Sequence, residues 1–196
     1  MITLKNIATI TSILFLLSSC TDNQQQKDKN NNLQEHDLHT QQSSSGNYAD
    51  SVNLGLITED TLKGSPERTA METIGKTHLH ITYHSPGVKG RIIWGGLVPF
   101  NKVWVTGAHS ATSLQINQPV LIGEKKIDAG TYAIFTIPGE NEWIFILNKN
   151  YNQHLADDYT ETEDAVRLKI IPAENMLTQR LSYSISKTTE KSGKIV

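Results

Sequence analysis

Cysteine is almost absent from this sequence, because Cys20 is the only one among its 196 residues. A disulfide within the chain, a cysteine-ligated zinc or iron–sulfur site and a thiol nucleophile all need cysteines elsewhere, so the rest of the chain can form none of them. Any metal site beyond residue 20 must use imidazole or carboxylate ligands. The seven histidines therefore become the residues to follow.

Positive charge is also in short supply, since 18 Lys and Arg stand against 20 Asp and Glu. A formal net charge of −2 leaves no basic excess for a phosphate backbone, so we expect no nucleic-acid partner. The sequence has no Gly-x-Ser-x-Gly, no glycine-rich phosphate loop and no His-Glu-x-x-His. Whether the protein is an enzyme stays open at this point.

The first twenty residues have the organisation of an export signal. Lys5 provides a basic start, and residues 7–17 form an apolar run that is too short to span a bilayer. The following Leu-Ser-Ser-Cys resembles the lipobox of bacterial lipoproteins, in which the cysteine is acylated and becomes the new N-terminus. We expect residues 1–19 to be a lipoprotein signal peptide and Cys20 to carry acyl chains such as palmitate. These would anchor the protein to the cell envelope, at the outer membrane or the periplasmic face; an ordinary cleaved signal is the alternative.

Residues 20–64 form a second region, rich in Gln, Asn and Ser. Such a composition buries too little apolar surface to offset the entropy of ordering the chain. We therefore expect a disordered linker between the lipid anchor and a folded domain. His36 and His39 lie in this linker, and we expect both to be solvated.

From residue 65 onward the sequence has the period of β-structure. Residues 77–84 alternate strictly, so Leu79, Ile81 and Tyr83 face one way and the histidines between them face the other. Further strands or hairpins are expected at residues 69–74, 120–127, 130–137, 142–148, 166–171 and 179–185. No segment has a sustained helical period. The predicted fold is all-β, a single antiparallel β-sandwich or barrel-like domain over residues 65–186, followed by a frayed tail at residues 187–196.

Three segments carry a resemblance to a known family. They are SPGVKGRIIWGGLVPFNKVWVTGA at residues 85–108, AGTYAIFTIPG at residues 129–139, and the stretch 142–150. Together they resemble the signature of an uncharacterised bacterial domain-of-unknown-function family (2911 type) of secreted proteins and lipoproteins. The resemblance implies one all-β domain behind a signal or lipobox, and it implies no activity. This chain departs from the family pattern at His78, His80 and His109.

Those histidines suggest a metal site. Residues two apart on a strand project from the same face, so His78 and His80 can offer two imidazoles to one ion. His109, on a turn, is the candidate third ligand, and His154 is the fourth. Asp157 or Asp158 could instead ligate the ion or orient an imidazole. Zinc or copper would suit such ligands; the alternative is that the histidines are solvated residues on the polar face of a strand.

A second set of candidates lies in the segment 85–108. Lys89 and Arg91 could bind an anion with the nearby glycine amides, or Arg91 could fix the loop through backbone carbonyls. Trp94, with Trp104 and Trp143, could form a platform for a sugar, although we expect at least two of the three to lie in the core.

Three functions therefore remain open. The first is a lipid-anchored envelope protein that binds a transition metal through clustered histidines. The second is a non-metal ligand- or glycan-binding module that uses the surface around Arg91 and Trp94. The third is a metal-assisted enzyme with an acid–base group such as Asp157 beside an open coordination position.

Overall fold

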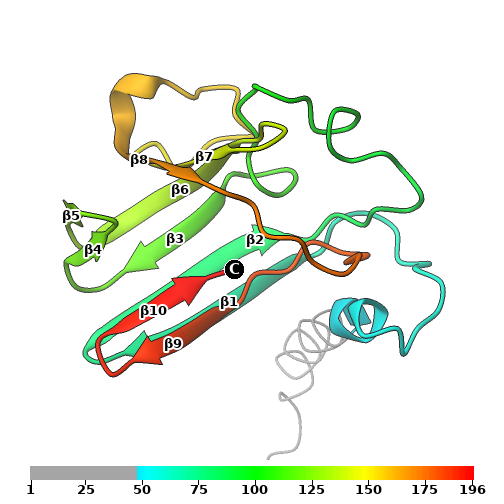
Figure 1. Ribbon diagram of the computed structural model, residues 1–196, viewed down its shortest axis with the longest axis horizontal. Helices are drawn as coiled ribbons and strands as arrows, with labels where there is room; N and C mark the ends of the chain where they lie inside the picture. The colour runs from blue at the N-terminus through cyan, green and yellow to red at the C-terminus, as the bar shows by residue number, and fades with distance from the viewer. Residues whose placement is uncertain (1–47) are drawn as a thin grey trace, which may run out of the picture.

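The computed structural model describes residues 48–196, and it is built on one antiparallel sheet of six strands in the order β1-β2-β3-β6-β7-β8 (Figure 1). These strands are β1 (Glu67–Ile74), β2 (Thr77–His84), β3 (Thr112–Ile116), β6 (Gly130–Ile137), β7 (Trp143–Asn148) and β8 (Asp164–Ile170). The expected signal peptide, Cys20 and most of the expected linker lie outside the described residues. Within the described part, no helix is both long and apolar enough to cross a membrane.

The main core lies on the face of the sheet that the alternation in β2 predicts. Ile81 stands opposite Leu114, and Leu79 stands opposite Ile116, in the register of β2 and β3. Directly opposite residues of antiparallel strands share a face, so each strand adds its apolar set to the same side. The buried members of this core are Ile81, Tyr83, Leu114, Ile116, Ile127, Ile134, Leu147 and Val166.

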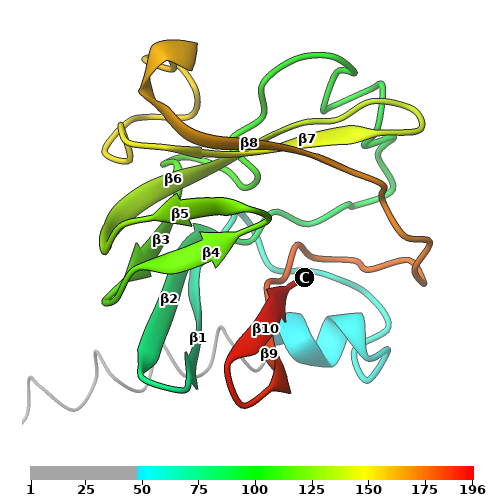
Figure 2. The ribbon, with the colours of Figure 1, turned by 60° about the vertical axis from the view of Figure 1, so that its left-hand side comes forward.

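Two short hairpins cover this face as a second layer. The hairpin of β4 (Val120–Ile122) and β5 (Lys125–Ile127) and the hairpin of β9 (Ile185–Thr189) and β10 (Ser192–Ile195) both contribute isoleucines to the main core. Figure 2 shows both hairpins on the same side of the curved sheet. The predicted all-β, sandwich-like fold is confirmed.

The opposite face is covered over only part of its width. A smaller core of Val105, Ala111, Phe135 and Ile146 lies between the β6–β7 part of the sheet and the loops that cross it. Over β1 and β2, the same face carries the histidine side of β2 and, opposite it, the exposed side chains of Thr69, Met71 and Thr73. The sheet therefore has one fully packed face and one face that is open at its β1 edge.

The C-terminal residues differ from the sequence expectation. Residues 187–196, predicted to be a frayed tail, form most of the β9–β10 hairpin, whereas residues 179–184 of the predicted 179–185 strand run extended with a single bridge at Arg180. The hairpin depends on contacts that are remote in sequence, because Ile195 packs on the main core and a Cβ at Gly193 would collide with Ile74. Local composition, dominated by Lys, Thr and Ser, does not reveal these contacts.

Residues 48–64, predicted to belong to the disordered linker, pack against the domain. The described chain starts in a helix that runs to residue 53 and buries Ala49 and Val52. Asn53 holds the backbone of Arg180 from both sides, since its Nδ2 donates to Arg180 O at 2.9 Å and its Oδ1 accepts from Arg180 N at 2.8 Å. The ordered unit therefore begins before residue 65.

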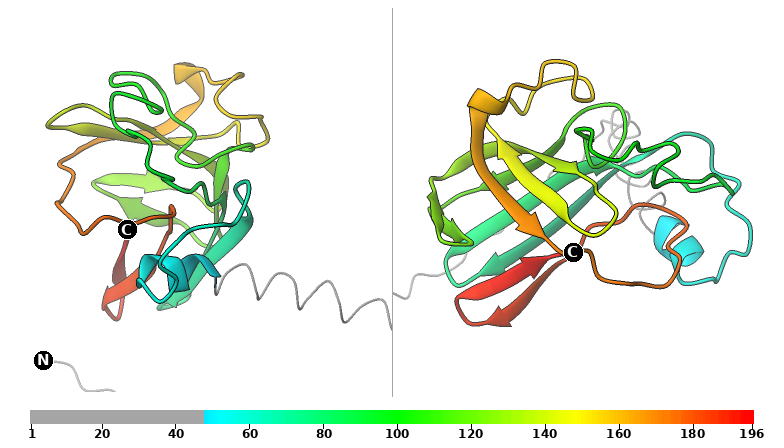
Figure 3. Two further views of the ribbon diagram at one scale, coloured as in Figure 1. Left: turned by 90° about the vertical axis from the view of Figure 1, so that its right-hand side faces the viewer. Right: turned by 45° about the horizontal axis from the view of Figure 1, so that its top comes forward.

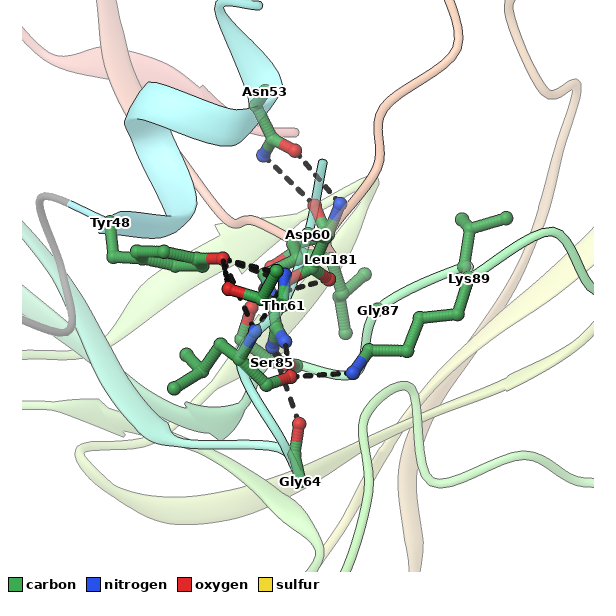
Figure 4. Close-up of polar contacts among 12 residues, drawn as sticks. Tyr48, Asn53, Asp60, Thr61, Gly64, Ser85, Gly87, Lys89 and Leu181 are labelled. Carbon is green, nitrogen blue, oxygen red and sulfur yellow. Dashed lines mark hydrogen bonds and ion pairs between the residues drawn. The ribbon is translucent and has the colours of Figure 1, made fainter. Parts of the chain in front are cut away.

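A buried ion pair fastens this N-terminal segment to the sheet domain. The Arg180 side chain is 0% exposed and that of Asp60 is 6% exposed, with 2.9 Å between Nε and Oδ2. The guanidinium also donates to the carbonyls of Leu62 at 2.6 Å, Ser85 at 2.9 Å and Gly64 at 3.3 Å (Figure 4). Arg180 therefore joins three separate parts of the chain.

Replacing Asp60 by Ala should lower the free energy of unfolding by about 3–5 kcal/mol, because it leaves the buried Arg180 charge without its carboxylate. Urea unfolding of the purified protein, followed by circular dichroism, measures this change. The control is Glu142→Ala, which removes the partner of Lys169 in a solvent-exposed ion pair of 2.9 Å. The control should unfold at the wild-type urea concentration; an equal loss in both variants would contradict a special role for Asp60.

Candidate functional site

The loop that follows β2, residues 85–108, is fixed against the C-terminal segment of residues 172–184. Leu181 N donates to Pro86 O at 3.0 Å, and Ser85 Oγ donates to Leu181 O at 2.7 Å. The two segments are paired at Gly87 and Arg180, and Figure 3 shows both at the same end of the sheet. They form the two walls of the candidate site.

A compact turn in this loop presents Trp94. Gly95 has a φ of +75°, and its N donates to Val98 O at 2.9 Å, which closes the turn. A Cβ at Gly96 would collide with the carbonyl oxygen of Ile92, so the turn needs a residue without a side chain there. The two glycines of Trp-Gly-Gly therefore set the direction in which the indole leaves the backbone.

Three tryptophans meet at this place. The ring centroid of Trp94 lies 4.6 Å from that of Trp143 and 5.6 Å from that of Trp104, both in edge-to-face geometry. Trp94 is 44% exposed, and the other two are half-buried. The expectation that at least two of them lie in the core is corrected: Trp104 packs against the smaller core without being enclosed by it. Trp94 is therefore the member of the cluster that is most exposed to solvent.

The cluster lies in an open groove of about 1060 Å³ between the two walls. Its lining is largely apolar and contains no acidic side chain and no histidine. Met176 and Leu177, which are 88% and 73% exposed, stand on one wall, and Leu97 and the cation Lys102 stand on the other. The groove combines a large apolar surface with positive charge, and its volume is close to the upper end of the range for ligand sites.

Arg91 also lines the groove, and its guanidinium fixes the loop. Its Nη2 donates to Gly87 O at 2.5 Å and its Nε to Val88 O at 3.1 Å, which is the carbonyl-binding alternative of the two predicted for this residue. The Lys89 amine donates to Leu62 O at 2.6 Å. Both cations therefore hold the backbone, and neither is arranged as an anion-binding loop.

The predicted histidine ligands lie in two separate places. His78 and His80 point from the open face of β2 with ring centroids 6.4 Å apart. His109 lies beside His84 at the other end of the strand. The rise of about 3.3 Å per residue puts His84 about 13 Å along the strand from His80, too far for one ion to bind both. Among residues 48–196, no three His, Cys, Asp or Glu side chains are placed to hold a metal together.

The pair His84–His109 has a defined geometry. The ring centroids are 5.1 Å apart with 80° between the planes. His109 has a φ of +62°, in the left-handed region that non-glycine residues seldom adopt, and its carbonyl accepts a hydrogen bond from Leu155 N at 2.7 Å. Partial burial, followed by the neighbouring His109, lowers the pKa of His84, while Glu67 acts in the opposite direction. The neutral form of His84 is therefore favoured at neutral pH.

The fourth predicted ligand lies on the loop after β7. His154 Nδ1 is 2.9 Å from Asp157 Oδ2, and both side chains are exposed. Ser110 and His154 form an isolated backbone bridge, so this loop runs beside His109. Asp158 is exposed and uses its carbonyl to accept from Asn150 Nδ2 at 3.3 Å.

A buried carboxylate holds this loop to the sheet. Asp164 Oδ2 accepts from Tyr159 Oη at 2.8 Å and from Arg167 Nη1 at 2.7 Å, and Asp164 Oδ1 accepts from Asn148 Nδ2 at 2.8 Å. Burial, and next the hydrogen bond to Asp164, raise the pKa of Tyr159 to about 12. The Tyr159 hydroxyl donates a hydrogen bond to Asp164 and so holds this loop against the sheet without any ligand.

Sequence reasoning missed the second wall of the groove. Met176 and Leu177 follow Pro172 in a stretch that belongs to no strand. The signal that could have found them is an apolar pair in a segment with no alternation to bury it. Met176 and Leu177 become candidate ligand contacts only because the fold places them in the same groove as Trp94.

A family model described as "Protein of unknown function (DUF2911)" matches residues 65–196. The match includes β1 to β10 and both walls of the groove. The family membership predicted from the three sequence segments is confirmed. No curated protein and no solved structure gives a significant match to the chain.

Substitution Gly96→Ala should displace Trp94 from the tryptophan cluster, because the new Cβ and the Ile92 carbonyl cannot occupy the same space. We expect loss of the near-ultraviolet circular dichroism that packed indoles produce, with the far-ultraviolet β signal retained. The control is Gly130→Ala, since a Cβ there makes only ordinary contact with Tyr132 at 3.5 Å. An unchanged near-ultraviolet spectrum in Gly96→Ala would show that the turn does not position the indole.

Proposed function

The chain belongs to the DUF2911 family, whose description names no activity. From the geometry of the groove, we propose that the protein is a non-metal ligand-binding module. The ligand class is an amphipathic molecule with an apolar body and a negative charge. It binds between the loop of residues 85–108 and the segment of residues 172–184.

The tryptophan cluster is the observation that carries this proposal. Large aromatic side chains are usually covered in a folded domain, and their exposure in a concave site marks a contact surface. Trp94 is 44% exposed at the centre of a groove, while Trp104 and Trp143 hold its ring from two sides. An indole held in this way loses little conformational freedom when a ligand covers it.

The lining favours an amphipathic anion over a neutral glycan. Sugar hydroxyls need many donors and acceptors, and the groove has no carboxylate and only Asn175 as a side-chain amide. Aliphatic side chains such as Leu97, Met176 and Leu177 instead offer surface to an acyl chain. Lys102 has no acidic neighbour in the lining, so its charge favours an anionic group on the ligand.

Calorimetry with dodecanoate, below the concentration at which it forms micelles, tests the proposal directly. Wild-type protein should bind this probe, and Trp94→Ala should weaken binding by about tenfold or more, which corresponds to about 1.4 kcal/mol of lost contact. Dodecyl maltoside has the same tail without the charge, and it should bind more weakly. Lys102→Ala should remove that difference between the two probes.

The matched control is Leu121→Ala, which removes an apolar side chain that is exposed on β4 outside the groove. It should bind dodecanoate as the wild type does. Oligogalacturonate, an acidic glycan without an apolar tail, completes the set of probes. Binding of this glycan without binding of dodecanoate would overturn the amphipathic class, and wild-type affinity in Trp94→Ala would overturn the site.

The cell envelope is the location that we infer for this binding module, through a lipid on Cys20. The support is the Leu-Ser-Ser-Cys sequence after an apolar run of signal length. In a bacterial host, substitution Cys20→Ser should abolish incorporation of labelled palmitate and move the protein out of the membrane fraction. Ser19→Ala keeps a small residue before the cysteine and should leave both properties intact. Palmitate incorporation in Cys20→Ser would contradict the anchor.

A further inference from the structure

We propose that His84 and His109 form a two-imidazole site for a divalent transition-metal ion, copper or zinc, separate from the groove. This site differs from the predicted one because it pairs His109 with His84 and leaves His78 and His80 outside. Neither residue of the pair lines the groove.

The separation of the two rings carries the proposal. An imidazole nitrogen bonded to zinc or copper at about 2.0–2.1 Å puts its ring centroid about 3.2 Å from the ion, so two neighbouring ligands have centroids about 4.5–5.2 Å apart. The centroids of His84 and His109 are 5.1 Å apart. The two rings therefore already stand at the spacing of neighbouring ligands of one ion.

The pair His78–His80 has the wrong separation for such a site. Its centroids are 6.4 Å apart, which on the same bond lengths requires ligands on opposite sides of the ion. As the side chains are placed, the two rings stand at 82° to each other and are not arranged as neighbouring ligands of one ion. In addition, His78 Nδ1 lies 3.0 Å from Thr73 Oγ1 and already has a hydrogen-bonding partner.

The backbone holds His109 beside His84. The left-handed φ of +62° at His109 is maintained by two hydrogen bonds with the next loop, from Leu155 N to His109 O at 2.7 Å and from Ala111 N to Gln153 O at 3.0 Å. A non-glycine residue persists in this region only where its surroundings determine the conformation. The imidazole is therefore presented from a fixed turn, which lowers the entropy lost on binding an ion.

A carboxylate adds negative charge on the same side of the sheet. Glu67 stands directly opposite His84 in the register of β1 and β2, so its side chain leaves the same face. Because no third protein ligand is in place among the described residues, water completes the coordination. Such a site is accessible and exchangeable, and it suits binding or carriage of an ion better than a structural role.

Titration of Cu²⁺ and Zn²⁺ into purified protein without a histidine tag, by calorimetry, tests the pair. All proteins carry His36→Ala and His39→Ala, because these two histidines lie outside the described residues. We expect one equivalent of Cu²⁺ in this background. His84→Ala with His109→Asn should weaken binding by about tenfold or more, since Asn accepts the left-handed backbone while removing the imidazole.

The matched control replaces an equal number of histidines on the same strand, His78→Ala with His80→Ala, and it should bind Cu²⁺ as the background protein does. Electron paramagnetic resonance of the Cu²⁺ complex should show coupling to two imidazole nitrogens, which disappears only in the His84/His109 variant. Loss of binding in the control, or equal affinity in all proteins, would overturn the proposal. Trp94→Ala should leave Cu²⁺ binding unchanged, which keeps this test independent of the groove.

Discussion

The buried charge of Arg180 is the constraint on which the candidate site depends. A guanidinium without solvent contact is stable only where its hydrogen-bond donors and its charge are matched. Here Asp60 supplies the countercharge, and carbonyls of Leu62, Gly64 and Ser85 accept hydrogen bonds. These partners come from the segment before β1 and from the start of the 85–108 loop, and Arg180 lies on the 172–184 segment, so neutralising one side chain also fixes one groove wall against the other. The groove is then preorganised, and a ligand does not have to order its walls on binding.

The same arrangement explains why the groove is left open. The main core, which the β4–β5 and β9–β10 hairpins cover, includes none of the three tryptophans, and Trp104 packs against the smaller core instead. A longer covering layer would bury Trp94 and gain hydrophobic stabilisation, but it would remove the concave surface. At the groove the fold therefore leaves apolar area exposed and forgoes the stabilisation that its burial would give.

Features set by local patterning could be predicted from the sequence. The alternation in residues 77–84 predicts β2 and its buried face, and the Pro-Gly turn predicts the β6–β7 hairpin. Features set by distant contacts could not. The β9–β10 hairpin is stabilised by packing on the main core, and the helix that runs to residue 53 is held by the hydrogen bonds between Asn53 and the backbone of Arg180. The histidines show both cases. The alternation of residues along β2 predicts that His78 lies beside His80. That His109 lies beside His84 depends on how the loop of residues 85–111 folds back to the end of β2.

The end of β2 is where the two proposed sites come closest in the chain. His84 belongs to the imidazole pair, and the next residue, Ser85, begins the groove wall and accepts from Arg180. At the other end of the same loop, Gly107 packs so tightly that a Cβ would lie 2.8 Å from Thr112 Oγ1 and 3.3 Å from His84 O. Proximity by itself does not create coupling, which requires an element with two arrangements that each ligand stabilises differently. The backbone here is held by Arg180 on one side and by Gly107 on the other, and such a fixed connection favours independent binding at the two proposed sites.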